Sequence, residues 1–153
     1  MADVVENHHG TAIALGAHAV LIRGAPGSGK SDLALRCLAM APTALVPSPA
    51  VLVADDRVEL TLSAERLIAA APAVIRGKLE VRGLGIMTVP STPSASLVLV
   101  ADLVAPERVE RLPDPPEATD IMGVRLPLIR LAPFEAAAPA KLLLALAQTL
   151  KSA

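Results

Sequence analysis

Apolar residues occur along this chain in short runs that are bounded by Gly, Pro and Asp residues. Short runs of this kind are typical of β-strands that are buried on one or both faces. Two runs flank Gly16 and Ala17, which predicts a β-hairpin. The pattern as a whole predicts strands at 11–15, 18–23, 51–54, 57–62, 67–70, 79–81, 97–101 and 124–131.

Two segments have their apolar residues at helical spacing instead. The first follows a glycine-rich stretch and is expected to run to about Met40, because Pro42 cannot continue a helix. The second spans about 138–150. Its leucine face favours packing in the core or between subunits over a cofactor site: Leu142, Leu143, Leu146 and Leu150. Many strands and few helices predict an α/β fold built on a mixed β-sheet.

The chain has 153 residues, of which 53% are hydrophobic and 19% are charged. This balance predicts a packed interior and excludes a disordered chain. Proline-rich stretches at 90–93 and 113–116 do not divide the chain into two viable domains. We therefore expect a single domain over 1–153, with a core over about 8–131 and a C-terminal helix over about 138–150.

Charge and composition disfavour two classes of partner. The formal net charge is −1 and Phe134 is the only aromatic residue, so nucleic acid is not an expected partner. Prolines interrupt the uncharged stretch 37–54, which argues against a membrane span. The first nine residues lack the features of a secretion signal, which favours a cytoplasmic protein. Cys37, the single cysteine, is expected to be a small buried residue.

A glycine-rich motif carries the clearest chemical signal. Residues 24–31 match GxxxxGKS between an apolar run and a helical pattern. Such a loop directs backbone N–H groups and a helix N-terminus at phosphate oxygens. Lys30 is expected to reach the β- and γ-phosphates, and Ser31 to bind Mg²⁺. The motif predicts ATP and Mg²⁺ as cofactors, bound by Gly24, Ala25, Pro26, Gly27, Ser28, Gly29, Lys30 and Ser31.

A pair of acidic residues, Asp55 and Asp56, follows the apolar run at 51–54. Paired acids in this position either begin a turn or hold magnesium in a phosphate-binding enzyme. The upstream phosphate loop favours the second interpretation. One carboxylate then serves the metal, and the other accepts a proton from an attacking hydroxyl group.

The segment 79–86 places an acid and a base between apolar residues before two glycines. Glu80 and Arg82 are expected on one face of a strand that leads into a glycine-rich turn. From the residues alone, an exposed strand with an ordinary salt bridge is slightly favoured over a functional segment.

Four blocks, in this order, resemble the catalytic domain of the HPr kinase/phosphorylase family: His9-Gly10, the phosphate loop, 53–58 and 80–86. The resemblance spans roughly His9 to Arg111 and looks like a short form without the family's N-terminal domain. It implies a fold of the phosphoenolpyruvate-carboxykinase branch of P-loop proteins. It also implies a serine kinase that phosphorylates the phosphocarrier protein HPr and so regulates the phosphotransferase system.

The resemblance assigns roles to particular residues. Asp56 would be the proton acceptor, with Asp55 beside it and His9 next to the reacting phosphate. Arg111 would assist the reaction on phosphoserine. Glu80 would join Ser31 in binding magnesium. The family's P-V-x-x-G-R-N-like loop, which contributes to phosphorolysis, has no counterpart at 131–138, so removal of the phosphate stays open.

Two other functions remain as alternatives. A small-molecule kinase or NTPase would share Lys30, Ser31 and the paired aspartates but would not need the segment 80–85. A nucleotide-sensing regulator would bind ATP without turnover. The resemblance also implies a homo-oligomer, a hexamer in most of the family, and the mean hydropathy of +0.55 suits subunit contacts.

Overall fold

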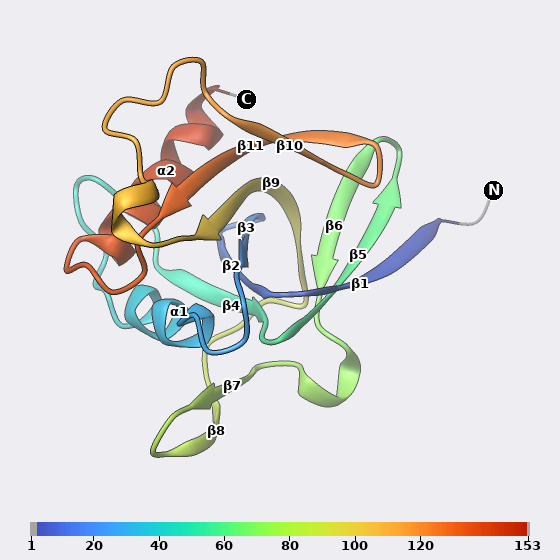
Figure 1. Ribbon diagram of the computed structural model, residues 1–153. Helices are drawn as coiled ribbons and strands as arrows, with labels where there is room; N and C mark the ends of the chain where they lie inside the picture. The colour runs from blue at the N-terminus through green and yellow to red at the C-terminus, as the bar shows by residue number, and fades with distance from the viewer. Residues whose placement is uncertain (1–2, 153) are drawn as a thin grey trace.

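The computed structural model describes residues 3–152. Within that range it has a nine-stranded sheet, a separate two-stranded hairpin and two α-helices (Figure 1). The strands are β1 (Val4–His9), β2 (Thr11–Leu15), β3 (His18–Arg23), β4 (Ala50–Ala54), β5 (Arg57–Ser63), β6 (Arg66–Ala70), β7 (Lys78–Val81), β8 (Gly85–Thr88), β9 (Ser94–Leu103), β10 (Ala118–Ile121) and β11 (Val124–Leu131). The helices are α1 (Lys30–Leu38) and α2 (Ala138–Ser152), with 3-10 turns at Ala73–Ile75 and Pro106–Arg108.

The sheet is mixed, as the sequence predicts. Its strand order is β1-β5-β6-β9-β3-β2-β4, and β11 also pairs with β9. The predicted hairpin is present, because β2 pairs antiparallel with β3. On the other side β2 pairs antiparallel with β4, while β9 runs parallel to both β3 and β11. The strands β3, β4, β9 and β11 therefore run in the same direction.

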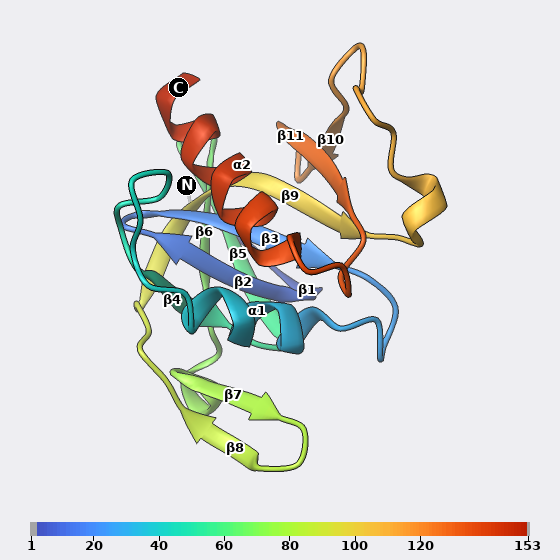
Figure 2. The ribbon, with the colours of Figure 1, turned by 90° about the vertical axis from the view of Figure 1, so that its left-hand side faces the viewer.

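The central strands β2 and β3 are buried on both faces, which explains their continuous apolar runs. Their side chains alternate between two cores. Ile13 and Ile22 pack with residues of α1 and α2, and both helices cover the same face of the sheet (Figure 2). Ala12 and Leu21 pack on the opposite face with residues of the outer strands β5, β6, β10 and β11.

The helices agree closely with the sequence analysis. α1 begins at Lys30 and ends at Leu38, two residues before the expected end. α2 begins at Ala138 as predicted, and its leucines Leu142, Leu143 and Leu146 are buried in the core. Core packing is thus confirmed as the role of this leucine face. No helix among residues 3–152 is both long and apolar enough to cross a membrane.

Three strands have no signal in the apolar pattern. β1 has the sequence VVENHH and is largely exposed. Its strand conformation is stabilised by antiparallel pairing with β5. β8 completes a hairpin with β7 that projects from the body of the molecule, and β10 pairs with β11 (Figure 1). The expectation that Glu80 and Arg82 share one strand face is wrong, since β7 ends at Val81 and Arg82 lies in the turn.

Candidate functional site

The candidate site lies at the edge where β3, β4, β9 and β11 end. The phosphate loop follows β3 and Asp55 follows β4, although β2 separates these strands in the sheet. The ends of β9 and β11 reach the same edge on the other side of β3. Ligands of α/β proteins bind at the carboxyl ends of such strands, so the topology gathers the predicted chemistry in one place.

The phosphate loop turns tightly between β3 and α1. The Ser28 N–H donates to the Ala25 carbonyl oxygen at 3.0 Å. Gly27 and Gly29 have φ angles of 79° and 101°, in the left-handed region that favours glycine. A Cβ atom at Gly24 would lie 2.4 Å from the Ser28 hydroxyl oxygen, so a side chain there would require Ser28 to move. The loop therefore requires its glycines and leads directly into the N-terminus of α1.

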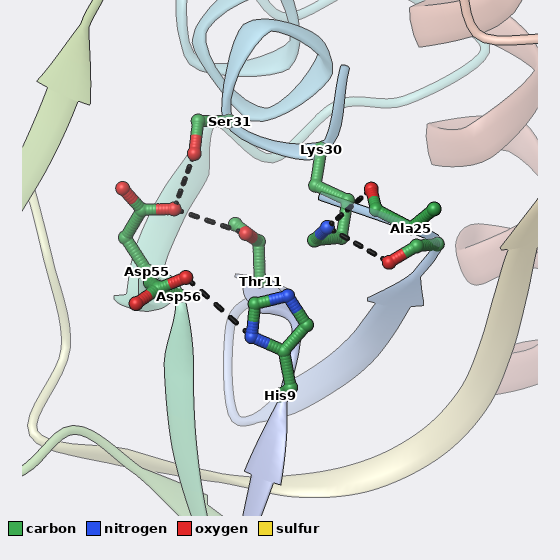
Figure 3. Close-up of polar contacts among 8 residues, drawn as sticks. His9, Thr11, Ala25, Lys30, Ser31, Asp55 and Asp56 are labelled. Carbon is green, nitrogen blue, oxygen red and sulfur yellow. Dashed lines mark hydrogen bonds and ion pairs between the residues drawn. The ribbon is translucent and has the colours of Figure 1, made fainter. Parts of the chain in front are cut away.

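Lys30, the first residue of α1, lies folded across this loop and is only 7% exposed. Its Nζ atom donates hydrogen bonds to the carbonyl oxygens of Gly24 and Ala25, at 2.9 and 3.0 Å (Figure 3). The ammonium group is thus held inside the turn of the loop. This position suits the predicted role of Lys30 toward the β- and γ-phosphates.

Asp55 is the buried centre of the site, with an exposed fraction of 6%. Its Oδ1 atom accepts hydrogen bonds from the Ser31 hydroxyl at 2.6 Å and from the Thr11 hydroxyl at 2.9 Å (Figure 3). Its Oδ2 atom accepts one from the Glu80 backbone N–H at 3.1 Å. Three donors from β2, α1 and β7 therefore compensate the buried carboxylate and fix its orientation.

Asp56 differs from its neighbour in almost every respect. It has a φ angle of 65°, which aspartate tolerates better than most residues, and its side chain is 79% exposed. His9 Nδ1 lies 3.5 Å from Asp56 Oδ1 (Figure 3). The backbones are joined as well, because the Gly10 N–H donates to the Asp56 carbonyl oxygen at 3.1 Å. β1 thus brings the predicted histidine to the predicted proton acceptor.

The two remaining predicted residues are placed differently. Glu80 lies on β7 with its backbone bound to Asp55 and its side chain exposed. Arg111 is exposed in the loop between the 3-10 turn at Pro106–Arg108 and β10, and no contact joins it to His9 or to either aspartate. The structure therefore brings together the predicted residues except Arg111.

The donor set suits a magnesium–nucleotide complex. Mg²⁺ is usually held by one or two carboxylates together with substrate phosphates. Ser31 and Asp55 supply a hydroxyl and a carboxylate beside the phosphate loop, and the backbone N–H of Glu80 donates to Asp55. Among residues 3–152 no group of three or more His, Cys, Asp or Glu side chains is positioned to bind a metal ion.

Sequence reasoning missed one residue of this site. Thr11 is completely buried at the start of β2, and its hydroxyl is one of the three donors to Asp55. A threonine that begins an apolar strand is an ordinary β-former, so the sequence offers no signal for this role. Only the pairing of β2 with β4 brings Thr11 to the end of β4.

Comparisons with known proteins agree with this architecture. The family model described as HPr Serine kinase C-terminal domain matches residues 2–152. HPr kinase/phosphorylase of Clostridium tetani is 41% identical over 91 residues, which cover 60% of this chain and 27% of that protein. HPr kinase/phosphorylase of Streptococcus sanguinis is 34% identical over 134 residues, which cover 80% of this chain and 40% of that protein. The chain thus matches two fifths or less of the length of these relatives.

A solved structure supports the same assignment. The HPr(Ser) kinase/phosphatase from Coxiella burnetii superposes with a TM-score of 0.77 and 25% sequence identity. The match covers 96% of this chain and 91% of that chain. The predicted α/β fold, similar to the HPr kinase catalytic domain, is therefore confirmed. With a family model matching nearly its entire length, this chain belongs to the HPr serine kinase C-terminal domain family.

Proposed function

We propose that this protein is an ATP- and Mg²⁺-dependent kinase that phosphorylates a serine of the phosphocarrier protein HPr. The observation that carries the proposal is the arrangement of a buried and an exposed aspartate beside a phosphate loop. Asp55 is bound to Ser31 at 2.6 Å, and Asp56 lies open to solvent next to His9. The names of the relatives, which are HPr kinase/phosphorylases, support HPr as the substrate.

The nucleotide half of the reaction rests on the loop and on Asp55. Backbone N–H groups of the loop and the Lys30 ammonium group would bind the β- and γ-phosphates. Ser31 and Asp55 would hold Mg²⁺, and Glu80, whose backbone N–H binds Asp55, would contribute its carboxylate. When bound, the metal ion would offset the negative charge of the phosphates. Phosphoryl transfer needs mainly such positioning and charge compensation.

The protein half of the reaction rests on Asp56. Its exposed carboxylate can approach the hydroxyl of an incoming serine and accept the proton as the oxygen attacks the γ-phosphorus atom. The bond from this phosphorus to the β-phosphate oxygen would break, and ADP would leave. His9, whose Nδ1 is 3.5 Å away, would orient this carboxylate beside the transferred phosphate. We also assign Arg111 a role on phosphoserine, which requires its exposed loop to approach the bound protein. In phosphorolysis, inorganic phosphate would attack the phosphorus of phosphoserine, Asp56 would give a proton to the serine oxygen as it leaves, and pyrophosphate would form.

The proposal includes a cytoplasmic location, where ATP is available, and assembly into a homo-oligomer, a hexamer by resemblance. Several large apolar side chains outside the cores support self-association, among them Leu84, Ile86 and Leu112, which are between 62% and 81% exposed. Sedimentation velocity at several protein concentrations tests this part. A single monomeric species at every concentration would contradict it.

The kinase proposal is tested by incubating the protein with HPr, Mg²⁺ and γ-labelled ATP. We expect acid-stable label on one HPr serine, located by mass spectrometry, and at least a 100-fold lower rate for Asp56→Asn, roughly the contribution of a general base. Asp120→Asn is the matched control, since Asp120 is also exposed but lies on β10. ATP binding without phosphoryl transfer would indicate a nucleotide sensor and not a kinase. ATP hydrolysis without labelled HPr would indicate an NTPase.

A further inference from the structure

A cavity of about 540 Å³ lies directly beside the phosphate loop. Its walls come from Ser28 of the loop, from the residues that end and follow β9, and from the residues that follow β11. The lining residues are Ser28, Leu103, Val104, Ala105, Pro106, Ala132, Pro133, Phe134 and Glu135. All side chains in this lining except those of Ser28 and Glu135 are apolar. The cavity therefore suits a flat, weakly polar group that is connected to the phosphate site.

Phe134 is the most unusual residue of this wall. It is the only aromatic residue among 153, yet it is 71% exposed. Its ring lies against the phosphate loop, because a Cβ atom at Gly29 would stand 2.9 Å from the ring carbon Cζ. A large apolar side chain that core packing does not use, next to a phosphate site, has a face free for a ligand.

The loop that carries Phe134 is anchored on both sides. The Arg36 guanidinium of α1 donates to the Pro133 carbonyl oxygen, and Arg36 is itself paired with Asp32 at 3.0 Å. The side chain of Glu135 forms an ion pair with Lys141 of α2. Both helices therefore fix the residues before and after Phe134. The ring is held in place in advance, which lowers the entropy lost when a ligand stacks on it.

The strand order separates this cavity from Asp55. β9 and β11 lie on the side of β3 opposite to β2 and β4, so the cavity and Asp55 flank the phosphate loop from two sides. The Asp55 side is assigned to magnesium and the incoming serine. Ser28 lines the cavity, and its hydroxyl oxygen, which lies against Gly24, is buried and has no hydrogen-bond partner among the described atoms.

We propose that this cavity binds the nucleoside of the phosphate donor, with the base stacked on Phe134. The inference rests on the proposed binding of a nucleoside triphosphate by the adjacent loop and adds the subsite for the base. Stacking is tolerant of the identity of the base, because every base has a flat π-face. Sequence reasoning did not find this site because one phenylalanine carries no signal by itself.

Titration calorimetry with two ligands tests the proposal. Mg²⁺–ATP carries a nucleoside, whereas Mg²⁺–tripolyphosphate has the phosphates alone. We expect the wild-type protein to bind ATP more tightly than tripolyphosphate. In Phe134→Ala and Phe134→Leu, the affinity for ATP should fall about tenfold and that for tripolyphosphate should stay the same. Phe134→Trp should keep the affinity for ATP, and Leu112→Ala, which truncates another exposed apolar side chain, should change neither.

Four other outcomes would each contradict the proposal, and each would point to a different explanation. Unchanged ATP binding in Phe134→Ala and Phe134→Leu would place the base elsewhere. An equal loss for both ligands would show that the ring only supports Gly29 and the loop. A change in self-association without a change in ATP affinity would assign the cavity to a second copy of the chain. Failure of the wild-type protein to bind either ligand would overturn the proposed function together with the subsite.

Discussion

The Ser31 hydroxyl oxygen lies 2.6 Å from Asp55 Oδ1, although 24 residues separate them in the sequence. This hydrogen bond joins the phosphate loop to the acidic end of β4. A hydroxyl that donates its proton to a carboxylate keeps its own lone pairs available for another partner. In the proposed function, this contact would orient the Ser31 hydroxyl for magnesium binding beside Asp55.

Replacing Asp55 with Asn should weaken magnesium binding. The amide keeps the shape of the side chain but loses the charge, so we expect an affinity for Mg²⁺ in the presence of ATP that is lower by about 10- to 100-fold. Calorimetric titration of Mg²⁺ measures this value. Asp56→Asn makes the same change of charge one residue later, on a side chain that is 79% exposed, and should leave magnesium affinity within about twofold of the wild-type value. Equal losses in the two variants would contradict the separate roles.

Thr11→Val should destabilise the protein without touching the phosphate loop. Valine has nearly the same shape but removes the donor that lies 2.9 Å from Asp55, and it leaves the other two donors in place. Because the carboxylate is buried, the free energy of unfolding should fall by about 1–3 kcal/mol. Urea denaturation measures the change, and Thr11→Ser, which keeps the hydroxyl group, should recover most of it. If Thr11→Val and Thr11→Ser have equal stability, the hydrogen bond contributes nothing.

Gly10→Ala should separate His9 from Asp56. A Cβ atom at position 10 would stand 2.8 Å from the backbone oxygen of Ile22, which lies in the centre of the sheet and cannot easily move. We therefore expect the end of β1 to shift and the free energy of unfolding to fall by about 1–3 kcal/mol. Kinase activity should fall with it. Asn7→Ala, on an exposed position of β1, is the control and should change both values little.

Cys37 gives a prediction for alkaline pH. Burial raises the pKa of its thiol from 9.0 to about 12, a shift that the nearby Arg36 only partly offsets. The unfolded chain releases this proton above pH 9 while the folded protein retains it. The contribution of Cys37 to stability is therefore complete below pH 9 and is lost as the pH rises toward 12.

A comparison with Cys37→Ala isolates this effect. The wild-type protein should lose stability relative to the variant by at most about 1.4 kcal/mol for each pH unit above 9. Urea denaturation between pH 8 and pH 10.5 measures the difference, and all other titrating groups are common to both proteins. A difference that stays constant over this range would mean that the thiol is accessible in the folded state.

Local patterns account for the parts of this protein that the sequence predicts well. The phosphate loop is recognisable because glycines, a lysine and a serine must stand at fixed spacing between a strand and a helix. The strands β2 and β3 are recognisable because burial on both faces demands continuous apolar runs. By contrast β1 is polar and exposed, and nothing within its own six residues predicts a strand.

The sequence by itself determined the chemical groups of this protein: a phosphate loop, two adjacent acids and a histidine near the N-terminus. Only the tertiary structure decided which environment and which partners each group has. Asp55 turns inward to Ser31 and Thr11, while Asp56, in a left-handed conformation, turns outward to His9. Two adjacent residues of the same type can therefore differ in burial and in hydrogen-bond partners. Burial, donors and partners come from strands that pair across long stretches of chain, and local sequence does not encode that pairing.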